Sequence, residues 1–173
     1  MVRSLFEQCV SKPKLIRGIF GVRRPEAYEL LLPKVKAPVY VLGPYVTGSG
    51  GCDSIQPYEL IPELIKKYAT MGHVVFEGII VTSVYGQVGT LMEQWKKQSV
   101  FLFLDTPLEV CLARVEARRG GKGRDERLIK NVTGKYNSAL RVKERVLADG
   151  IMRAEVASSS NAHKTIIKLL QGS

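Results

Sequence analysis

The chain has 173 residues, 45% of them hydrophobic, which suits one soluble domain that buries its apolar surface around a single core. It contains no run of about 18 apolar residues and no apolar stretch of the kind that a signal peptide needs, so we expect a cytoplasmic protein without a membrane partner. Its three cysteines and two histidines form no CxxC pair and no cluster, which argues against a zinc site. The formal net charge of +10 indicates a polyanionic partner, either a nucleotide or a nucleic acid. The oligomeric state leaves no signal in the sequence.

The first residues already have a helical pattern. Val2, Leu5 and Phe6 are apolar at helical spacing, and no N-cap residue precedes them. We therefore expect a helix from the first residue onward, as though the chain began inside a helix.

Short apolar segments alternate with helical ones along the rest of the chain. The predicted strands are residues 37–43, 73–78, 100–105 and 151–157, and the predicted helices are residues 57–70, 87–97, 107–119 and 161–171. Strands that alternate with helices pair in parallel through right-handed crossovers. The pattern predicts an α/β fold over residues 1–173, a three-layer Rossmann-like parallel sheet with ligand sites at the carboxyl ends of its strands.

A glycine-rich loop, residues 45–53, follows the first predicted strand. Gly50 and Gly51 would let the main chain approach a ligand closely. We interpret the loop as a binding site for the acceptor substrate, in which Tyr45 stacks on a base and Asp53 accepts a proton or binds a hydroxyl. A flexible connection is the alternative.

Glu77 stands at the end of the second predicted strand, behind three apolar residues. A carboxylate at this position could hold a Mg²⁺-bound water or orient an acceptor. The alternative is a glutamate that caps the next segment.

Most of the excess positive charge lies in one segment. Residues 112–146 contain eleven Lys and Arg against four acidic residues, a net charge of +7. We predict a basic helical lid over residues 106–147, whose glycines would let it swing over phosphates. Its cations are Arg114, Arg118, Arg119, Lys122 and Arg124. A solvated basic helix end is the alternative.

Three segments in this order resemble the P-loop kinases. They are Phe-Glu-Gly-Ile-Ile at residues 76–80, the strand-to-helix junction at residues 103–114, and Arg-Arg-Gly-Gly-Lys-Gly-Arg at residues 118–124. The resemblance is to the branch that holds nucleoside and nucleotide kinases and phage kinases acting on DNA bases. It implies an ATP-dependent phosphotransferase that uses Mg²⁺ and acts on a nucleoside, nucleotide or DNA-base hydroxyl. The implied catalytic residues are Glu77, Asp53, Arg118 and Arg119.

The chain departs from this family at its start. The family opens with a central strand followed by G-x-x-x-x-G-K-S/T, and neither precedes the first helix here. We expect a chain truncated at its N-terminus that lacks this first strand and could be inactive as given. Three alternatives remain. The first is a degenerate phosphate loop at residues 43–50, with Ser49 where the lysine belongs, and the second is a non-catalytic nucleic-acid-binding protein that uses residues 112–146. The third is a structural relic that needs a partner chain to supply the missing strand.

Overall fold

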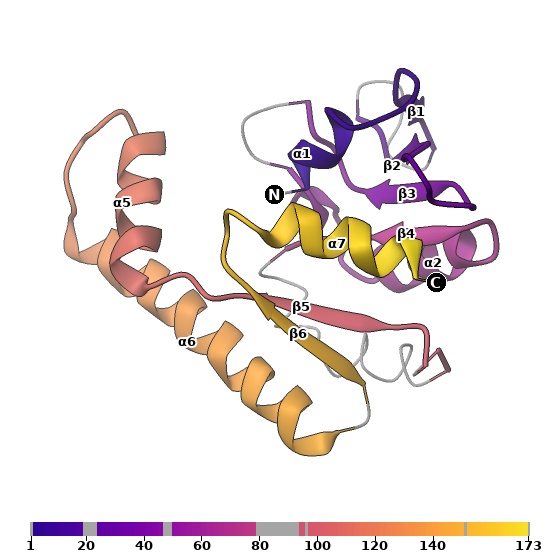
Figure 1. Cartoon of the computed structure of the whole chain (residues 1–173). Coiled ribbons are helices and arrows are strands. Elements are labelled where there is room, and N and C mark those ends of the chain that lie inside the picture. The colour runs from indigo at the N-terminus through magenta and orange to yellow at the C-terminus, as the bar shows by residue number, and fades with distance from the viewer. Residues whose placement is uncertain are drawn as a thin grey trace. The chain divides into compact units, whose positions relative to one another are not determined.

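The computed structural model describes residues 2–18, 24–46, 50–78, 94–95, 97–150 and 152–172. The chain forms two compact units, each described here by itself. The first comprises Met1–Leu91 with Ser160–Ser173, and the second comprises Met92–Ser159. In Figure 1 the first unit runs from indigo to magenta and includes the yellow α7, whereas the second is salmon to orange.

A four-stranded mixed sheet forms the centre of the first unit, in the order β1-β2-β3-β4. Its strands are β1 (Lys14–Ile16), β2 (Ala27–Leu30), β3 (Val39–Leu42) and β4 (His73–Val75). β2 pairs antiparallel with both β1 and β3, whereas β3 pairs in parallel with β4, Val39 opposite His73. All four residues of β3 are buried, as expected for a central strand.

Four helical segments accompany this sheet. They are α1 (Arg3–Phe6), the 3₁₀ turn η1 (Cys52–Ser54), α2 (Leu60–Ala69) and α7 (Ala162–Gln171). α2 connects β3 to β4 and buries one stripe at helical spacing, Ile61, Leu64, Ile65 and Tyr68. The Tyr68 ring stacks on Tyr40 of β3, with centroids 4.8 Å apart. α7 buries Ala162, Ile166 and Leu170, and the Gln171 amide donates to the Pro33 carbonyl at 3.1 Å.

The second unit joins a pair of parallel strands to two helices. β5 (Val100–Leu104) pairs with β6 (Arg153–Ala157), and α5 (Leu108–Arg118) lies against the 24-residue α6 (Glu126–Asp149), as Figure 1 shows. Asp125 caps α6, because its Oδ1 accepts from the Leu128 N–H at 2.6 Å. This N-cap fixes the residue at which the loop after α5 becomes helix again.

The four predicted strands are confirmed as β3, β4, β5 and β6, and the parallel pairing is confirmed for β3 with β4 and for β5 with β6. The α/β class is therefore confirmed. The sheet of the first unit is nevertheless mixed rather than fully parallel, because β1 and β2 form an antiparallel pair that needs only a short connection and no crossover helix. The P-loop kinase fold and the single domain stay predictions.

The predicted helices at residues 57–70, 107–119 and 161–171 are confirmed within a few residues at each end. The helix predicted over residues 87–97 lies largely outside the described residues. Within the part of the chain that the structure describes, no helix is long and apolar enough to cross a membrane.

Candidate functional site

The strongest cluster of predicted site residues lies at the carboxyl edge of β3 and β4. The loop that follows β3 carries Tyr45 and leads through Gly51 to Asp53 in η1, and Glu77 follows β4 by two residues. Because β3 and β4 are parallel neighbours, the segments that follow them meet at the same edge of the sheet. The structure therefore brings these predicted residues to one edge of the sheet, and their roles in binding and catalysis stay predictions.

The loop is attached to Glu77 by both main chain and side chain. The Cys52 N–H donates to the Glu77 carbonyl at 2.8 Å, and the Tyr45 hydroxyl donates to Glu77 Oε1 at 3.2 Å. Gly51 has φ +83°, and a Cβ at this position would lie 2.6 Å from the Glu77 carbonyl oxygen. Only glycine fits this approach. In this structure the group that the Gly51 main chain approaches is the Glu77 carbonyl, and a close approach to a ligand stays a prediction.

Tyr45 is the buried residue that supports the Glu77 carboxylate. Its side chain is only 8% exposed, and its ring lies in an aromatic group with Phe6 (centroids 5.4 Å apart) and Tyr28 (6.1 Å). The Arg3 guanidinium lies 5.8 Å from the ring centroid and donates to the Tyr45 carbonyl at 3.2 Å. The ring is therefore covered by protein in this structure, which does not favour the predicted stacking on a base, and its hydroxyl positions the Glu77 carboxylate.

Burial sets the electrostatics of the site. It raises the pKa of the half-buried Glu77 carboxyl above its usual value, while the hydrogen bond from Tyr45 acts in the opposite direction and the nearby Asp53 charge adds to the rise. Burial and the Glu77 charge also raise the pKa of Tyr45 far above its usual range, so the phenol stays a donor. Burial raises the pKa of Cys52 to about 12, which keeps this thiol protonated at neutral pH.

Asp53 is the exposed carboxylate of the site. It lies against Gly78, where an added Cβ would come within 2.5 Å of Asp53 Oδ1. Two carboxylates, one exposed and one half-buried, thus neighbour each other at the strand ends. Oxygen ligands of this kind suit Mg²⁺, which is commonly held by one or two carboxylates together with water and phosphate oxygens. Among the described residues no group of three or more His, Cys, Asp or Glu could hold a metal by itself.

Gly50 and its neighbours bear on the alternative phosphate loop at residues 43–50. Gly50 is close-packed, since a Cβ there would lie 2.7 Å from the Pro44 carbonyl and from the Tyr45 ring. Residues 47–49 lie outside the described residues, so this alternative stays open. The segment after Gly50 is the three-residue turn η1, and the helix α2 begins only at Leu60.

The lid cations all belong to the second unit and are all exposed. Arg124 pairs with Glu109 at 2.7 Å and with Glu116 at 2.9 Å, and Arg119 pairs with Asp125 at 3.0 Å. Two further arginines are tied into the same unit: Arg114 donates to the Ser159 hydroxyl at 2.9 Å and Arg118 donates to the Arg114 carbonyl at 3.2 Å. In this state carboxylates of the second unit hold Arg119 and Arg124, and the predicted role of Arg114, Arg118, Arg119, Lys122 and Arg124 over phosphates stays a prediction.

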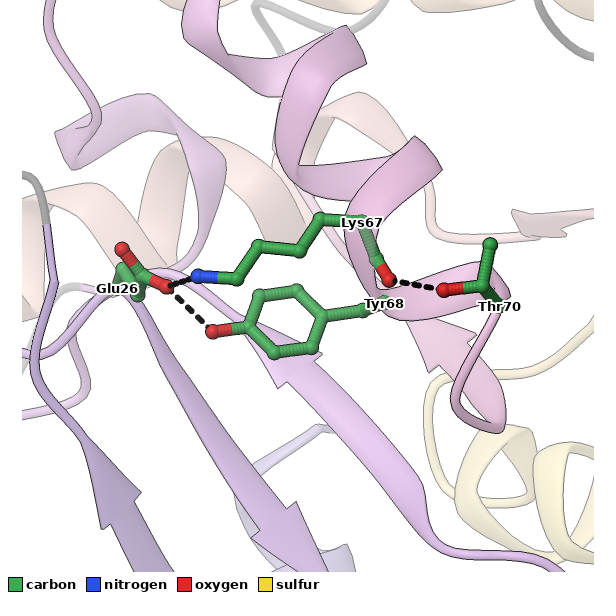
Figure 2. A network of polar contacts seen from close by, with 4 residues as sticks. All are labelled: Glu26, Lys67, Tyr68 and Thr70. Atoms are coloured by element: carbon green, nitrogen blue, oxygen red, sulfur yellow. Dashed lines mark hydrogen bonds and ion pairs between the residues drawn. The ribbon is translucent and has the colours of Figure 1, made fainter.

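Glu26 is a buried charge that the sequence analysis missed. Its side chain is 0% exposed, and its Oε1 accepts from Lys67 Nζ and from the Tyr68 hydroxyl, each at 2.5 Å; Figure 2 shows both side chains reaching it from α2. Its carbonyl accepts from the Gly43 N–H at 2.8 Å, so Glu26 lies at the sheet edge where the site loop begins. The signal available in the sequence was weak: a glutamate between Pro25 and Ala27, and a lysine next to a buried tyrosine.

Comparison with known proteins gives a consistent result. A family model described as 5-hmdU DNA kinase matches residues 31–161. The chain is 29% identical over 154 residues to a 5-hmdU DNA kinase of Pseudomonas phage M6, covering 83% of this chain and 78% of the relative. It is 31% identical over 137 residues to one of Pseudomonas phage PaMx11, covering 78% and 71%. A 5-hmdU DNA kinase 1 of Salmonella phage ViI is 39% identical over 90 residues, covering 47% and 39%.

No solved structure matches the chain. The predicted resemblance to phage kinases acting on DNA bases is confirmed at the level of the family, whereas the wider P-loop assignment stays a prediction. The match covers both the segment that carries Glu77 and the segment that carries the lid arginines. The chain belongs to the 5-hmdU DNA kinase family.

Proposed function

We propose that this chain is a kinase that phosphorylates the hydroxyl of a 5-hydroxymethyluracil base in DNA, with ATP as donor and Mg²⁺ as its metal. The family match and the names of the phage relatives support the kinase class and the base. In the major groove of a duplex the C5 substituent of a pyrimidine points outward, so such a hydroxyl is accessible at the DNA surface. The high net positive charge agrees with a DNA substrate.

The observation that carries the proposal is the pair of carboxylates at the carboxyl edge of β3 and β4. Asp53 is exposed and accepts the proton of the attacking hydroxyl, whereas Glu77 is half-buried and is held in place by Tyr45 and Cys52. A carboxylate that is fixed by its own partners is suited to orienting the acceptor or a metal-bound water rather than to moving.

Glu77 would hold Mg²⁺ through a bound water, and the metal would neutralise phosphate charge during the transfer. ATP supplies the phosphoryl group. The printed sequence holds no G-x-x-x-x-G-K-S/T, and the described residues offer no loop of that kind for a triphosphate. The resemblance alone therefore supports ATP as the donor, and the lid cations remain the predicted contacts of its phosphates.

The test is phosphoryl transfer from γ-³²P-ATP to a duplex oligonucleotide that carries one 5-hydroxymethyluracil, with a thymine duplex as reference. We expect label on the modified duplex only. Asp53→Asn should lower kcat by about 10²–10⁴-fold, as for the loss of a general base. Glu63→Gln is the matched control, because Glu63 is exposed on α2 and its ion-pair partner among the described residues is Lys66, so this variant should keep full activity.

Equal labelling of the thymine duplex, or full activity of Asp53→Asn, would contradict the proposal. The second candidate is a non-catalytic DNA-binding protein, which the net charge of +7 in residues 112–146 favours. Salt-sensitive binding of the duplex without transfer of label at any Mg²⁺ concentration would support this candidate instead.

A further inference from the structure

One face of α6 carries basic residues near both of its ends. At about 100° per residue, Arg127, Lys130, Arg141 and Arg145 lie within a sector about 60° wide. All four are exposed. The residues that α6 buries, Leu128 and Val146, lie roughly 100° or more from this sector. We call these four residues the basic stripe.

Three of the four stripe cations form no close side-chain contact with an acidic group in the described part of the chain, and Arg127 acts on Asp125 only through its charge. Across the described part of the chain, no side-chain hydrogen bond or ion pair involves Arg127, Lys130 or Arg141. Arg145 lies 3.6 Å from Asp149, and both side chains remain substantially exposed. This distinguishes the stripe from the lid, where Glu109, Glu116 and Asp125 hold the arginines. A row of exposed cations on one helix face attracts a polyanion.

The spacing along the stripe is uneven. Arg127 and Lys130 form one group and Arg141 and Arg145 another, and the gap between Lys130 and Arg141 is about 17 Å at about 1.5 Å per residue. Between them the same face carries small polar positions, among them Gly134, around which the space is open. Two positively charged ends with small, uncharged residues between them suit phosphates on the two opposite rims of a groove. The major groove of DNA is about 12 Å wide between its rims.

We propose that the basic stripe binds the phosphate backbone of duplex DNA and so holds the substrate of this kinase. The inference rests on the proposed function, because that function makes DNA the partner. A duplex is favoured over a single strand since single-strand sites interleave cations with aromatic side chains that stack on bases. The one aromatic residue of α6, Tyr136, lies roughly 150° from the centre of the stripe.

Two double variants of the same helix test the proposal with equal loss of charge. Lys130→Gln with Arg141→Gln removes two stripe cations, whereas Lys135→Gln with Lys143→Gln removes two cations that lie outside the stripe. Binding of the full chain to a fluorescein-labelled thymine duplex is measured by anisotropy between 50 and roughly 300 mM salt, and circular dichroism verifies that helix is retained. Each phosphate contact contributes about 0.9 to the slope of log K against log salt, so the stripe variant should lose about 1.8 in slope and about 60-fold in affinity at 0.1 M salt.

The control variant should bind within about threefold of the wild type, since it removes no phosphate contact. Equal losses in both variants would overturn the proposal, because they would indicate a diffuse effect of net charge. Unchanged binding of the stripe variant, or tighter binding of single-stranded DNA than of duplex by the wild type, would also overturn it. The outcome is separable from the proposed function, since the thymine duplex accepts no phosphoryl group and the transfer assay is run independently.

Discussion

Removal of the Lys67 ammonium should destabilise the protein more than removal of the carboxylate with which it pairs. Lys67→Met removes the Lys67 ammonium from Glu26, which is 0% exposed. Glu26→Gln keeps an acceptor for the Tyr68 hydroxyl, and it frees an ammonium whose side chain is already 50% exposed and can return to water. Because Glu26 is buried and Lys67 is half-exposed, the two substitutions should lower the unfolding free energy by different amounts.

The magnitudes follow from this asymmetry. Removing one partner of a fully buried ion pair costs about 3–5 kcal/mol, and because Lys67 is half-exposed we take about 2–3 kcal/mol for Lys67→Met. Glu26→Gln loses one charge-assisted hydrogen bond and should cost about 1–2 kcal/mol. In the double variant the amide replaces a buried carboxylate that has lost the Lys67 ammonium, so this variant should be more stable than Lys67→Met alone.

The assay is urea unfolding at pH 7, followed by circular dichroism at 222 nm and analysed for the unfolding free energy in water. Lys66→Met is the matched control: Lys66 is the neighbouring residue, its pair with Glu63 is exposed, and its loss should cost less than about 0.5 kcal/mol. A larger cost for Glu26→Gln than for Lys67→Met, or simple additivity in the double variant, would refute the reasoning.

Three further predictions concern the site and the second unit. Gly51→Ala should cost about 1–3 kcal/mol in unfolding free energy because its φ of +83° suits glycine alone, whereas Gly134→Ala in exposed α6 should stabilise by about 0.5–1 kcal/mol; similar values in urea melts would contradict the geometry. Tyr45→Phe removes the hydrogen bond that lowers the pKa of Glu77, so that pKa should rise further and the acidic limb of the kcat/KM profile should move to higher pH; an unmoved limb would mean that ionised Glu77 is not required. Thr106→Val should raise the unfolding free energy by about 1 kcal/mol, since the buried Thr106 hydroxyl has no hydrogen-bond partner among the described residues; a loss of stability would reveal a partner outside them.

The sequence predicted the elements whose pattern is long enough to be periodic. α2 shows why: Ile61, Leu64, Ile65 and Tyr68 repeat at helical spacing and are the residues that the helix buries. β1 and β2 were missed because they are short and carry Lys14 and Glu29, so neither shows the uninterrupted apolar run that marks β3. Their antiparallel pairing depends on tertiary contacts that no local pattern reports.

The sequence indicated where the candidate site lies in the fold, but not which of its side chains contact each other. Strand ends locate Glu77 and the glycine-rich loop, since parallel neighbours share an edge. The interactions between side chains were not predictable. Tyr45 was expected to face a ligand and instead supports Glu77, and Glu26 carries a charge at a position where burial is uncommon for its residue type.

The protonated, buried thiol of Cys52 can be used to measure how often the site loop opens. A thiol reagent needs both access and thiolate, and Cys52 offers neither while its main chain is bonded to Glu77. In a Cys9→Ser, Cys111→Ser background, the rate of labelling would thus measure how often the loop detaches from the strand end. A molecule that binds to the Asp53 and Glu77 carboxylates would hold the loop closed and slow the labelling of Cys52. Its binding could therefore be followed without any reaction.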